Sequence, residues 1–408
     1  MHGTGPRTWR RGRAAVKRSA ASPVRAQPPL IAHVIVRLGI GGLENGLVNL
    51  INSLPAHRFR HAVISLTDAS AFQARIRRSD VNVYCLGKRP GHDWTLYWKL
   101  WRLFRDIRPA ILHTRNLGAL DATVPARAAG IRRHVHGVHG WDVSDLHGTS
   151  RKYRLLRRAL DPAIDVYVAL SRDLERWLCC SVGIRSAKVH QIYNGVELTG
   201  FHPRNGDEAR AILPQGLREG AGAVFIWVGR MEAVKDPLNA LKAFALQTVP
   251  GARLVMLGSG SQLPTLKARC AEIGVAERVW FAGERNDVAP LLRAADIYVL
   301  SSLNEGISNT ILEAMASGLP VIASAVGGNA ELVLDGETGA LYPVGDARAL
   351  AARMAQYASN PALCRAHGAA ARARAASTFD LDQMVKRYAE LYEALLNSGT
   401  SASLITEH

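Results

Sequence analysis

The chain has 408 residues, of which 48% are hydrophobic; this indicates a globular protein of two or three domains and argues against a disordered one. The net charge of +17 and the pI near 10.1 make an anionic partner the natural expectation. No apolar run reaches about 18 residues, so no transmembrane helix is expected. The five cysteines are odd in number and lack Cys-x-x-Cys spacing, which indicates neither a disulfide framework nor a zinc site and fits a reducing cytoplasm.

The first 29 residues form a basic arm that contains seven Arg or Lys and no acid. The arm lacks the apolar core of a signal peptide, so we expect residues 1–29 to be disordered. Basic proteins bind nucleic acids or anionic membranes. No nucleic-acid-binding module is visible in this sequence, so we expect anionic nucleotide sugars and a membrane surface as partners, and no nucleic acid.

The first half of the ordered chain alternates strand and helix patterns. The expected strands are 31–36, 61–66, 81–85, 110–114, 133–138, 166–170 and 188–192. This alternation predicts a doubly wound parallel sheet. Ligands of such sheets lie beyond the carboxyl ends of the strands, which places His113, His139, Asp142 and Ser171 near one rim.

A glycine-rich turn that includes Gly41 and Gly42 follows the first strand and precedes a helix expected at 47–54. Glycine there allows the backbone to approach a phosphate or sugar closely. Glu44 stands where the dinucleotide fingerprint needs its third glycine, which argues against a nicotinamide enzyme. The alternative is a tight strand-to-helix turn without a ligand.

Two later segments have the pattern of surface helices. Trp94, Tyr97, Trp98 and Trp101 form one helical stripe, which we expect to be core or a lid on the sheet; an acceptor or interface surface is the alternative, because Trp and Tyr favour membrane boundaries. The segment 150–160 holds five Arg or Lys among apolar positions. That pattern is typical of a membrane-surface helix, with a solvated helix face as the alternative.

Three histidines lie near the end of the fifth expected strand. Alternation along a strand puts His134 and His136 on one face and His139 on the other, so we do not expect a metal site there. Asp380 and Asp382 make the single Asp-x-Asp, at a helix start where acids cap, and are not interpreted as metal ligands either.

A second strand–helix series follows a polar linker at about 200–222, with strands expected at 224–228, 253–257, 278–281, 296–300 and 321–323. Arg230 directly follows the first of these strands, and Lys235 comes five positions later. Two cations at a strand end suit a diphosphate, because Arg forks onto two oxygens and Lys supplies a point charge.

The segment Glu305–Pro320 predicts a turn and then a helix capped by Ser308 or Asn309. Backbone amides and the positive dipole end of such a helix attract phosphate. Glu305, just ahead of the helix, can accept hydrogen bonds from sugar hydroxyls, and Glu313, inside it, from the hydroxyls of a ribose. An amphipathic helix with one capping and one surface acid is the alternative.

The two glutamates, seven residues apart and followed by Ala-Met-Ala-x-Gly-x-Pro-Val, resemble the signature of retaining glycosyltransferases of family 4. The resemblance extends from about Ile31 to about Leu395, with Arg230, Lys235 and both glutamates in the family's order. Segments 152–156, 168–177, 191–196, 234–237 and 306–315 are similar to the sugar transferases encoded with bacterial exopolysaccharide and exosortase (PEP-CTERM) loci. One departure is Glu197, where the family has Asp.

The resemblance implies an α/β fold of the GT-B type, in which two doubly wound Rossmann-like domains face each other across a cleft. The implied division is 30–200 for the acceptor domain, 201–375 for the donor domain, 376–396 for a helix that packs back on the first domain, and 397–408 for a disordered tail.

The implied reaction moves a sugar from a nucleoside diphosphate sugar to an acceptor hydroxyl of a lipid-linked or saccharide acceptor with retention, in exopolysaccharide or cell-surface glycan biosynthesis. It needs no cofactor and no metal, in a cytoplasmic protein at the inner membrane face. The implied catalytic residues are Arg230, Lys235, Glu305 and His139, the last contacting the donor sugar. The implied donor-binding residues are Gly41, Gly42, Gly306, Ile307, Ser308, Asn309, Thr310, Glu313 and, at a turn that packs on the base, Arg285. His113 and Asp142 are expected on the acceptor side.

Three other functions stay open from the sequence. The first is an epimerase of the same fold acting on a nucleotide sugar. The second is a non-catalytic scaffold of a polysaccharide assembly complex, although such a protein would be expected to have lost one of the four charged residues named above. The third is a nucleic-acid binder, which rests on net charge alone.

Overall fold

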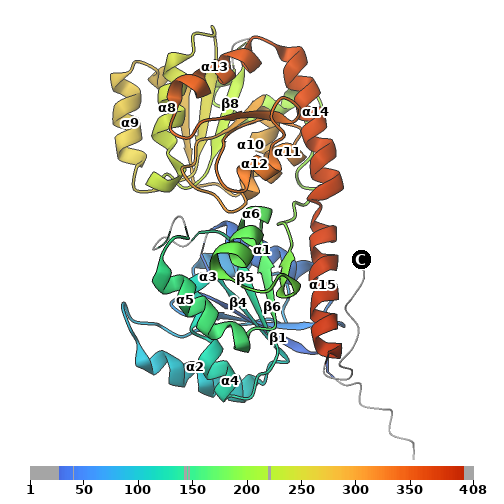
Figure 1. Ribbon diagram of the computed structural model, residues 1–408. Coiled ribbons are helices and arrows are strands. Elements are labelled where there is room, and N and C mark those ends of the chain that lie inside the picture. The colour runs from blue at the N-terminus through green and yellow to red at the C-terminus, as the bar shows by residue number, and fades with distance from the viewer. Residues whose placement is uncertain (1–26, 40, 142–144, 146–147, 219–221, 399–408) are drawn as a thin grey trace, which may run out of the picture.

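The computed structural model describes residues 27–39, 41–141, 145, 148–218 and 222–398, and all their side chains except those of 207–209. Two parallel sheets lie one above the other, each covered by helices, and the last two helices run along one side of both (Figure 1). None of the helices in this part of the chain is both long enough and apolar enough to cross a membrane.

The N-terminal sheet has seven parallel strands in the order β3-β2-β1-β4-β5-β6-β7. Its strands are β1 Leu30–Ile35, β2 Arg60–Ser65, β3 Asn82–Cys85, β4 Ile111–Arg115, β5 His134–Val138, β6 Val166–Ala169 and β7 Val189–Gln191. Its helices are α1 Gly42–Ser53, α2 Trp94–Ile107, α3 Asn116–Leu120, α4 Thr123–Ala128, α5 Arg151–Leu160 and α6 Arg172–Arg176.

The C-terminal sheet has six parallel strands in the order β10-β9-β8-β11-β12-β13. Its strands are β8 Val224–Val228, β9 Arg253–Leu257, β10 Val279–Gly283, β11 Ile297–Leu300, β12 Val321–Ser324 and β13 Gly339–Tyr342. The remaining helices are α7 Gln215–Arg218, α8 Pro237–Leu246, α9 Leu263–Glu272, α10 Val288–Ala294, α11 Asn309–Ala316, α12 Asn329–Leu332, α13 Ala347–Ala358, α14 Pro361–Thr378 and α15 Leu381–Asn397.

The order in which the chain adds strands reverses at one place in each sheet, between β1 and β4 and again between β8 and β11, while all the strands stay parallel. The crevice beside the carboxyl ends of such a strand pair is where doubly wound sheets bind ligands. The glycine-rich turn follows β1, Arg230 follows β8 and Glu305 follows β11, so the topology brings the predicted site residues to these two crevices.

The predicted α/β fold of the GT-B type is confirmed, including the helix that returns to the first domain. The expected strands agree with the observed ones within two residues. The strand β13 was not predicted, and α1 begins at Gly42 instead of Leu47, because the extended backbone of Gly41 already serves as its N-cap.

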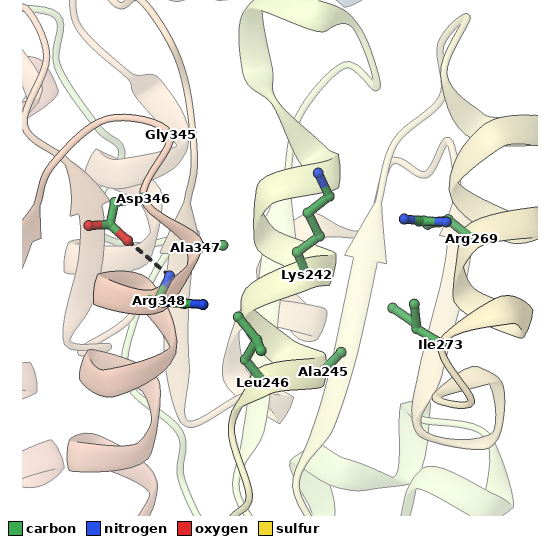
Figure 2. Close-up of a pocket in the computed structure, with 9 residues that line it drawn as sticks. All are labelled: Lys242, Ala245, Leu246, Arg269, Ile273, Gly345, Asp346, Ala347 and Arg348. Atoms are coloured by element: carbon green, nitrogen blue, oxygen red, sulfur yellow. Dashed lines mark hydrogen bonds between the residues drawn. The ribbon is translucent and has the colours of Figure 1, made fainter.

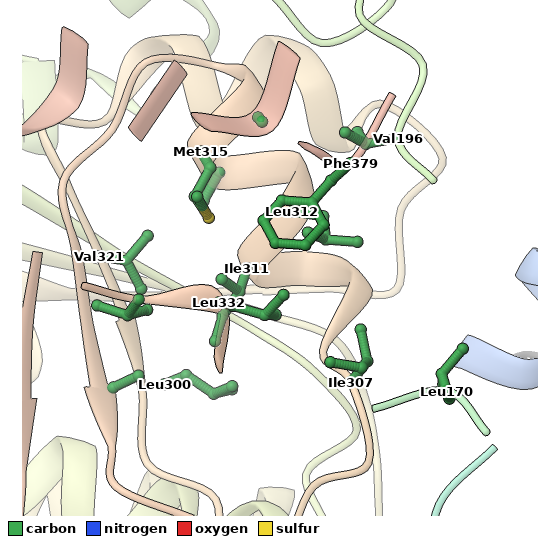
Figure 3. Packing of buried hydrophobic residues seen from close by; sticks show 14 of the residues in the cluster. Leu170, Val196, Leu300, Ile307, Ile311, Leu312, Met315, Val321, Leu332 and Phe379 are labelled. Carbon is green, nitrogen blue, oxygen red and sulfur yellow. The ribbon is translucent and has the colours of Figure 1, made fainter. Parts of the chain in front are cut away.

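The core of the C-terminal domain surrounds α11, as the spacing of Ile311, Leu312 and Met315 predicts (Figure 3). The same apolar cluster continues through Ile307, at the turn before the helix, to Leu170 in the N-terminal domain. The turn that precedes α11 is therefore packed on the core of its own domain and on Leu170 of the other domain.

The helix α15 completes the core of the N-terminal domain. Met384, Tyr388 and Tyr392 of α15 are buried in one cluster with Ile31 and Ile111 of the first sheet. The chain therefore crosses between the domains twice, and the two crossings are hydrogen-bonded to each other: the amide of residue 196 donates to the carbonyl of residue 379 at 2.8 Å.

The aromatic stripe of α2 is not a core element. The buried residues of this helix are Leu96, Leu100 and Phe104, whereas Trp94 and Trp98 are 78% and 57% exposed. The expectation of core or lid is wrong for these two residues, because a helical stripe of aromatic residues has the same spacing whether it faces the core or the solvent.

Candidate active site

Lys235 and Glu305 form an ion pair at the ends of β8 and β11. Lys235 ends a short 3₁₀ helix, and the next residue, Asp236, takes the left-handed conformation with φ 42° and caps α8. The Nζ of Lys235 donates to Oε1 of Glu305, and Ser302 Oγ donates to the same oxygen at 2.6 Å. Glu305 is only 8% exposed, so its carboxylate is held in place between a cation and a hydroxyl.

The first turn of α11 faces the N-terminal domain. Ser308 is its N-cap, with Oγ accepting from the amide of Ile311 at 3.4 Å, and Thr310 Oγ1 accepts from the hydroxyl of Tyr298 at 2.6 Å. Asn309 spans the domains: its Nδ2 donates to the carbonyl of Gly42 at 3.0 Å, and its Oδ1 accepts from Asn194 at 2.7 Å. The N-terminus of α11 therefore lies against the N-terminus of α1, and two helix dipoles point into one space.

Backbone contacts at Gly306 explain why this turn needs glycine. A Cβ at Gly306 would lie 2.6 Å from the carbonyl oxygen of His139 and 2.7 Å from the Cα of Gly140. On the other side, side chains at Gly327 and Gly328 would clash with the carbonyl oxygens of residues 305 and 306. The turn is thus enclosed between the N-terminal domain and the glycine pair.

Arg230 and Glu44 face each other from the two domains. Arg230 is exposed after β8, and Glu44, in the first turn of α1, folds its carboxylate back over Gly41. Burial raises the pKa of Glu44, while its own backbone amide and the charge of Arg230 oppose that shift. Arg230 therefore contributes positive charge at the tip of α1 as well as at the end of β8.

Glu313 is a partly buried acid on α11 that titrates near neutral pH. Burial raises its pKa to about 7, and the charge of Arg75, from the N-terminal domain, partly opposes the shift. Arg75 also donates to Asn45 Oδ1 at 2.6 Å, in the first turn of α1. Glu313 thus lies on the side of α11 that faces the same domain boundary as Glu305.

His139 is a neutral imidazole at the end of β5. Its amide donates to Asn116 Oδ1 at 2.7 Å, and Asn116 itself has the left-handed φ of 56°. Burial, and then the charge of Arg115, lowers the pKa of His139 to about 3. Both ring nitrogens are buried without a protein partner, so the ring can donate to or accept from a sugar hydroxyl.

His113 lies below His139, inside the domain. It is fully buried, and its Nδ1 is 2.7 Å from the hydroxyl of Tyr392 on α15. A Cβ at Gly137 would lie 2.5 Å from Nε2 of His139 and 3.3 Å from Nε2 of His113, so only glycine fits between the two rings. The acceptor-side role expected for His113 stays a prediction, and Asp142 lies outside the described residues.

The remaining histidines of the strand end lie as the alternation predicts. His134 and His136 share one face, where both rings bond to Thr114 Oγ1 at 2.8 and 2.9 Å. Within the described ranges, no three His, Cys, Asp or Glu side chains are grouped as metal ligands; that the reaction needs no metal stays a prediction.

Arg285 lies at the edge of the C-terminal sheet, after β10. Its guanidinium pairs with Asp287 at 2.5 Å and lies over the ring of Trp280. Its expected place beside the donor base stays a prediction.

A groove of about 650 Å³ lies elsewhere in the C-terminal domain, between α8, α9 and α13 (Figure 2). It is lined by Lys242, Leu246, Arg269 and Arg348 among others, and by none of the predicted site residues. We therefore place the candidate site at the domain boundary and not in this groove.

Two family profiles together match most of the chain. The profile described as Glycosyltransferase Family 4 matches residues 40–199, and the one described as Glycosyl transferases group 1 matches residues 210–374. The chain is a glycosyltransferase of the family 4 type.

Curated relatives and solved structures agree with this membership. The putative glycosyltransferase EpsD of Bacillus subtilis is 32% identical over 221 residues, 53% of this chain; the match spans 57% of EpsD. The UDP-Gal:alpha-D-GlcNAc-diphosphoundecaprenol alpha-1,3-galactosyltransferase of Escherichia coli is 29% identical over 78% of this glycosyltransferase and 84% of its own length. The crystal structure of Anabaena HepE in complex with UDP and glucose covers 90% of the chain and 100% of HepE, with a TM-score of 0.79 at 21% identity, which shows the same fold.

Several contacts of the glycosyltransferase across its domain boundary were not predicted from the sequence. Glu331, at the start of α12, accepts from the amides of Arg172 and Asp173 at 2.9 and 2.8 Å and from the hydroxyl of Tyr193 at 2.9 Å. Glu44 and Asn194 were likewise not assigned to the site. Only Glu44 carries a signal in the sequence: it follows a glycine-rich turn at the start of a helix, where an acid meets backbone amides.

Proposed function

We propose that this glycosyltransferase moves a sugar from a nucleoside diphosphate sugar to an acceptor hydroxyl and retains the anomeric configuration. The observation that carries the proposal is the meeting of two helix N-termini, α1 and α11, beside Arg230 and Lys235. Amide-lined helix tips with two cations form a site for a diphosphate.

The diphosphate is the leaving group, and its negative charge develops as the sugar departs. Arg230, Lys235 and the amides at the tip of α11 stabilise this charge in a fixed geometry, and one such donor is worth about 3 kcal/mol. The Lys235 ammonium has three N–H donors. One donates to Glu305, so two remain for phosphate oxygens. Two cations also supply the charge that a metal ion supplies in other transferases.

The remaining residues hold the two ends of the donor. Glu305, fixed by Lys235 and Ser302, accepts from sugar hydroxyls, and neutral His139 contacts the sugar from the opposite domain. Glu313 accepts from the ribose hydroxyls. Because Gly306 and Gly140 touch, the closed domains leave little room for water that would hydrolyse the donor.

The reaction follows from this arrangement without a covalent enzyme intermediate. The acceptor oxygen attacks the anomeric carbon on the face that the diphosphate leaves, so the new bond forms where the old one breaks. The acceptor proton passes to an oxygen of the departing phosphate.

We further propose an acceptor that is a saccharide or a lipid-linked saccharide of exopolysaccharide or cell-surface glycan synthesis, reached at the cytoplasmic face of the membrane. In support, the Escherichia coli relative is named for a diphosphoundecaprenol-linked acceptor, and EpsD matches half of this chain.

Thermal unfolding with a panel of UDP-, GDP- and ADP-sugars tests the donor class. A ligand at about 100 times its Kd stabilises by about 2.7 kcal/mol, so one nucleotide series should raise Tm while the free sugars do not. Stabilisation by none of the nucleotide sugars would overturn the proposal. Product analysis with and without acceptor then separates the transferase from an epimerase, which would change the sugar nucleotide in the absence of acceptor.

A further inference from the structure

An aromatic and basic face lies on three helices of the N-terminal domain. The helices α2 and α4 form the end of this domain that points away from the C-terminal domain, and α5 lies beside them (Figure 1). The helices α2 and α4 pack together, and Arg127 of α4 donates to the carbonyl of Ala163, just after α5, at 2.7 Å.

This face concentrates exposed apolar side chains. Trp94 and Trp98 of α2 are joined by Val124 of α4, 53% exposed, and Leu155 of α5, 62% exposed. These four are half of the eight large apolar residues that are exposed in the described part of the chain. Single exposed apolar residues are normal, but a group on neighbouring helices marks an interaction surface.

The polar residues of the same face are mostly cationic. Five of the exposed residues of α2 and α5 are Arg or Lys, and Asp106 is the one exposed acid among the described residues of the two helices. The five are Arg102, Arg105, Arg151, Lys152 and Arg158. The guanidinium of Arg102 lies 5.4 Å from the ring centre of Trp98, so charge and aromatic surface are presented together.

We propose that this face, which we call the α2–α5 face, is the docking surface for an anionic lipid bilayer. Indole rings prefer the headgroup level of a membrane, where one edge is apolar and the other is wet. Arginine and lysine beside them bind lipid phosphates and are attracted by the negative surface potential. An amphipathic arrangement of Trp and Leu with Arg and Lys is the composition of helices that lie in the interface plane.

From the sequence, the segment 150–160 is the expected membrane-surface helix, and the aromatic stripe of α2 is an interface surface only as the alternative to core or lid. On α5, Arg157 is buried against the ring of Trp177, and Tyr153, Leu156 and Leu160 pack on the core. The deepest apolar contact with the bilayer is therefore made by Trp94 and Trp98, from α2.

The position of the α2–α5 face leaves the C-terminal domain free of the membrane. That domain can open and close over a donor while the N-terminal domain stays docked. This inference rests on the proposed function in one respect only: a lipid-linked acceptor would be drawn from the same membrane.

Vesicle sedimentation of the full chain tests the docking surface. We expect binding to vesicles of phosphatidylcholine with one-quarter phosphatidylglycerol at low salt, weaker binding at high salt, and little binding to phosphatidylcholine alone. The double variant Trp94→Ala/Trp98→Ala should lower the partition coefficient at least tenfold. The matched control is Leu246→Ala, which removes an apolar residue of similar exposure (52%) from the C-terminal domain and should leave binding unchanged.

Two outcomes overturn the inference. The first is equal binding of the Trp variant and the wild type to the anionic vesicles, which would leave the basic arm as the binding element. The second is no binding to anionic vesicles at low salt, which would leave an acidic protein as the partner to seek. Thermal unfolding with the nucleotide sugar that stabilises the wild type then shows whether both variants are folded and still bind the donor. Vesicle binding without any nucleotide stabilisation would refute the proposed function and leave the docking surface standing.

Discussion

Replacing Glu313 with Gln should separate stability from donor binding. Burial raises the pKa of this carboxyl from 4.5 to about 7, so ionising it costs the folded state about 3 kcal/mol more than the unfolded chain. The folded state binds the extra proton between pH 4.5 and 7, and stability is therefore lost as the pH rises through that window. The cost is absent below the window and complete above it.

The variant Glu313→Gln stays neutral at every pH and escapes this cost. Its advantage in free energy of unfolding over the wild type should grow by about 2 kcal/mol between pH 5.5 and pH 8.5. Its affinity for the donor should fall, because the ribose hydroxyls lose a charged acceptor. In the wild type about one-tenth of the carboxyl is ionised at pH 6, so donor affinity should rise about tenfold between pH 6 and pH 8.

Denaturant unfolding without ligand and calorimetric titration of the nucleotide, each across pH 5.5 to 8.5, measure the two effects. The matched control is Glu337→Gln, which removes an exposed carboxylate from the same domain and should change neither. A Glu313→Gln variant no more stable than the wild type at pH 8.5 would contradict the burial of this acid. A wild-type affinity that does not change with pH would remove Glu313 from the ribose site.

Three further predictions concern the phosphate site and the domain boundary. Lys235→Ala should lower kcat about a hundredfold, with Lys242→Ala as the control in the same domain; near-normal turnover would remove Lys235 from the mechanism. Gly306→Ala should lower kcat and leave nucleotide affinity nearly unchanged, because the added methyl group meets the other domain at 2.6 Å. Gly216→Ala, in open space, is its control, and equal kcat of the two variants would show that closure is not needed. A chelator should leave activity intact, since the two cations carry the charge; loss of activity would refute metal-free transfer.

Most of the fold and the tip of α11 could be predicted because their signals are local. Buried parallel strands are short apolar runs between turn residues, and Ser308 caps the helix two residues after a glycine that its neighbours require. The pair of Lys235 and Glu305 was expected in one site from the resemblance, and their side chains are in contact.

The contacts between the domains could not be predicted from local patterns. Asn194, Glu331 and Arg75 act on partners more than a hundred positions away, and their spacing along the chain says nothing about how two domains meet. The pKa of Glu313 could not be predicted either, because it depends on burial in the folded protein and on the charge of Arg75 from the other domain. For α2, the residue spacing predicted the aromatic stripe, but the same spacing occurs whether a stripe faces the core or the solvent.

The return of α15 to the first domain makes the completion of that domain depend on a helix that is synthesised after the C-terminal domain. Tyr388, Tyr392 and Met384 fill the interior of the N-terminal domain, so that domain cannot complete its core before α15 has been synthesised. The C-terminal domain, whose strands and α14 emerge earlier, is free to complete first. A chain truncated near residue 380 would therefore keep the C-terminal domain, which lies next to the truncation in sequence. It would leave the N-terminal domain without α15.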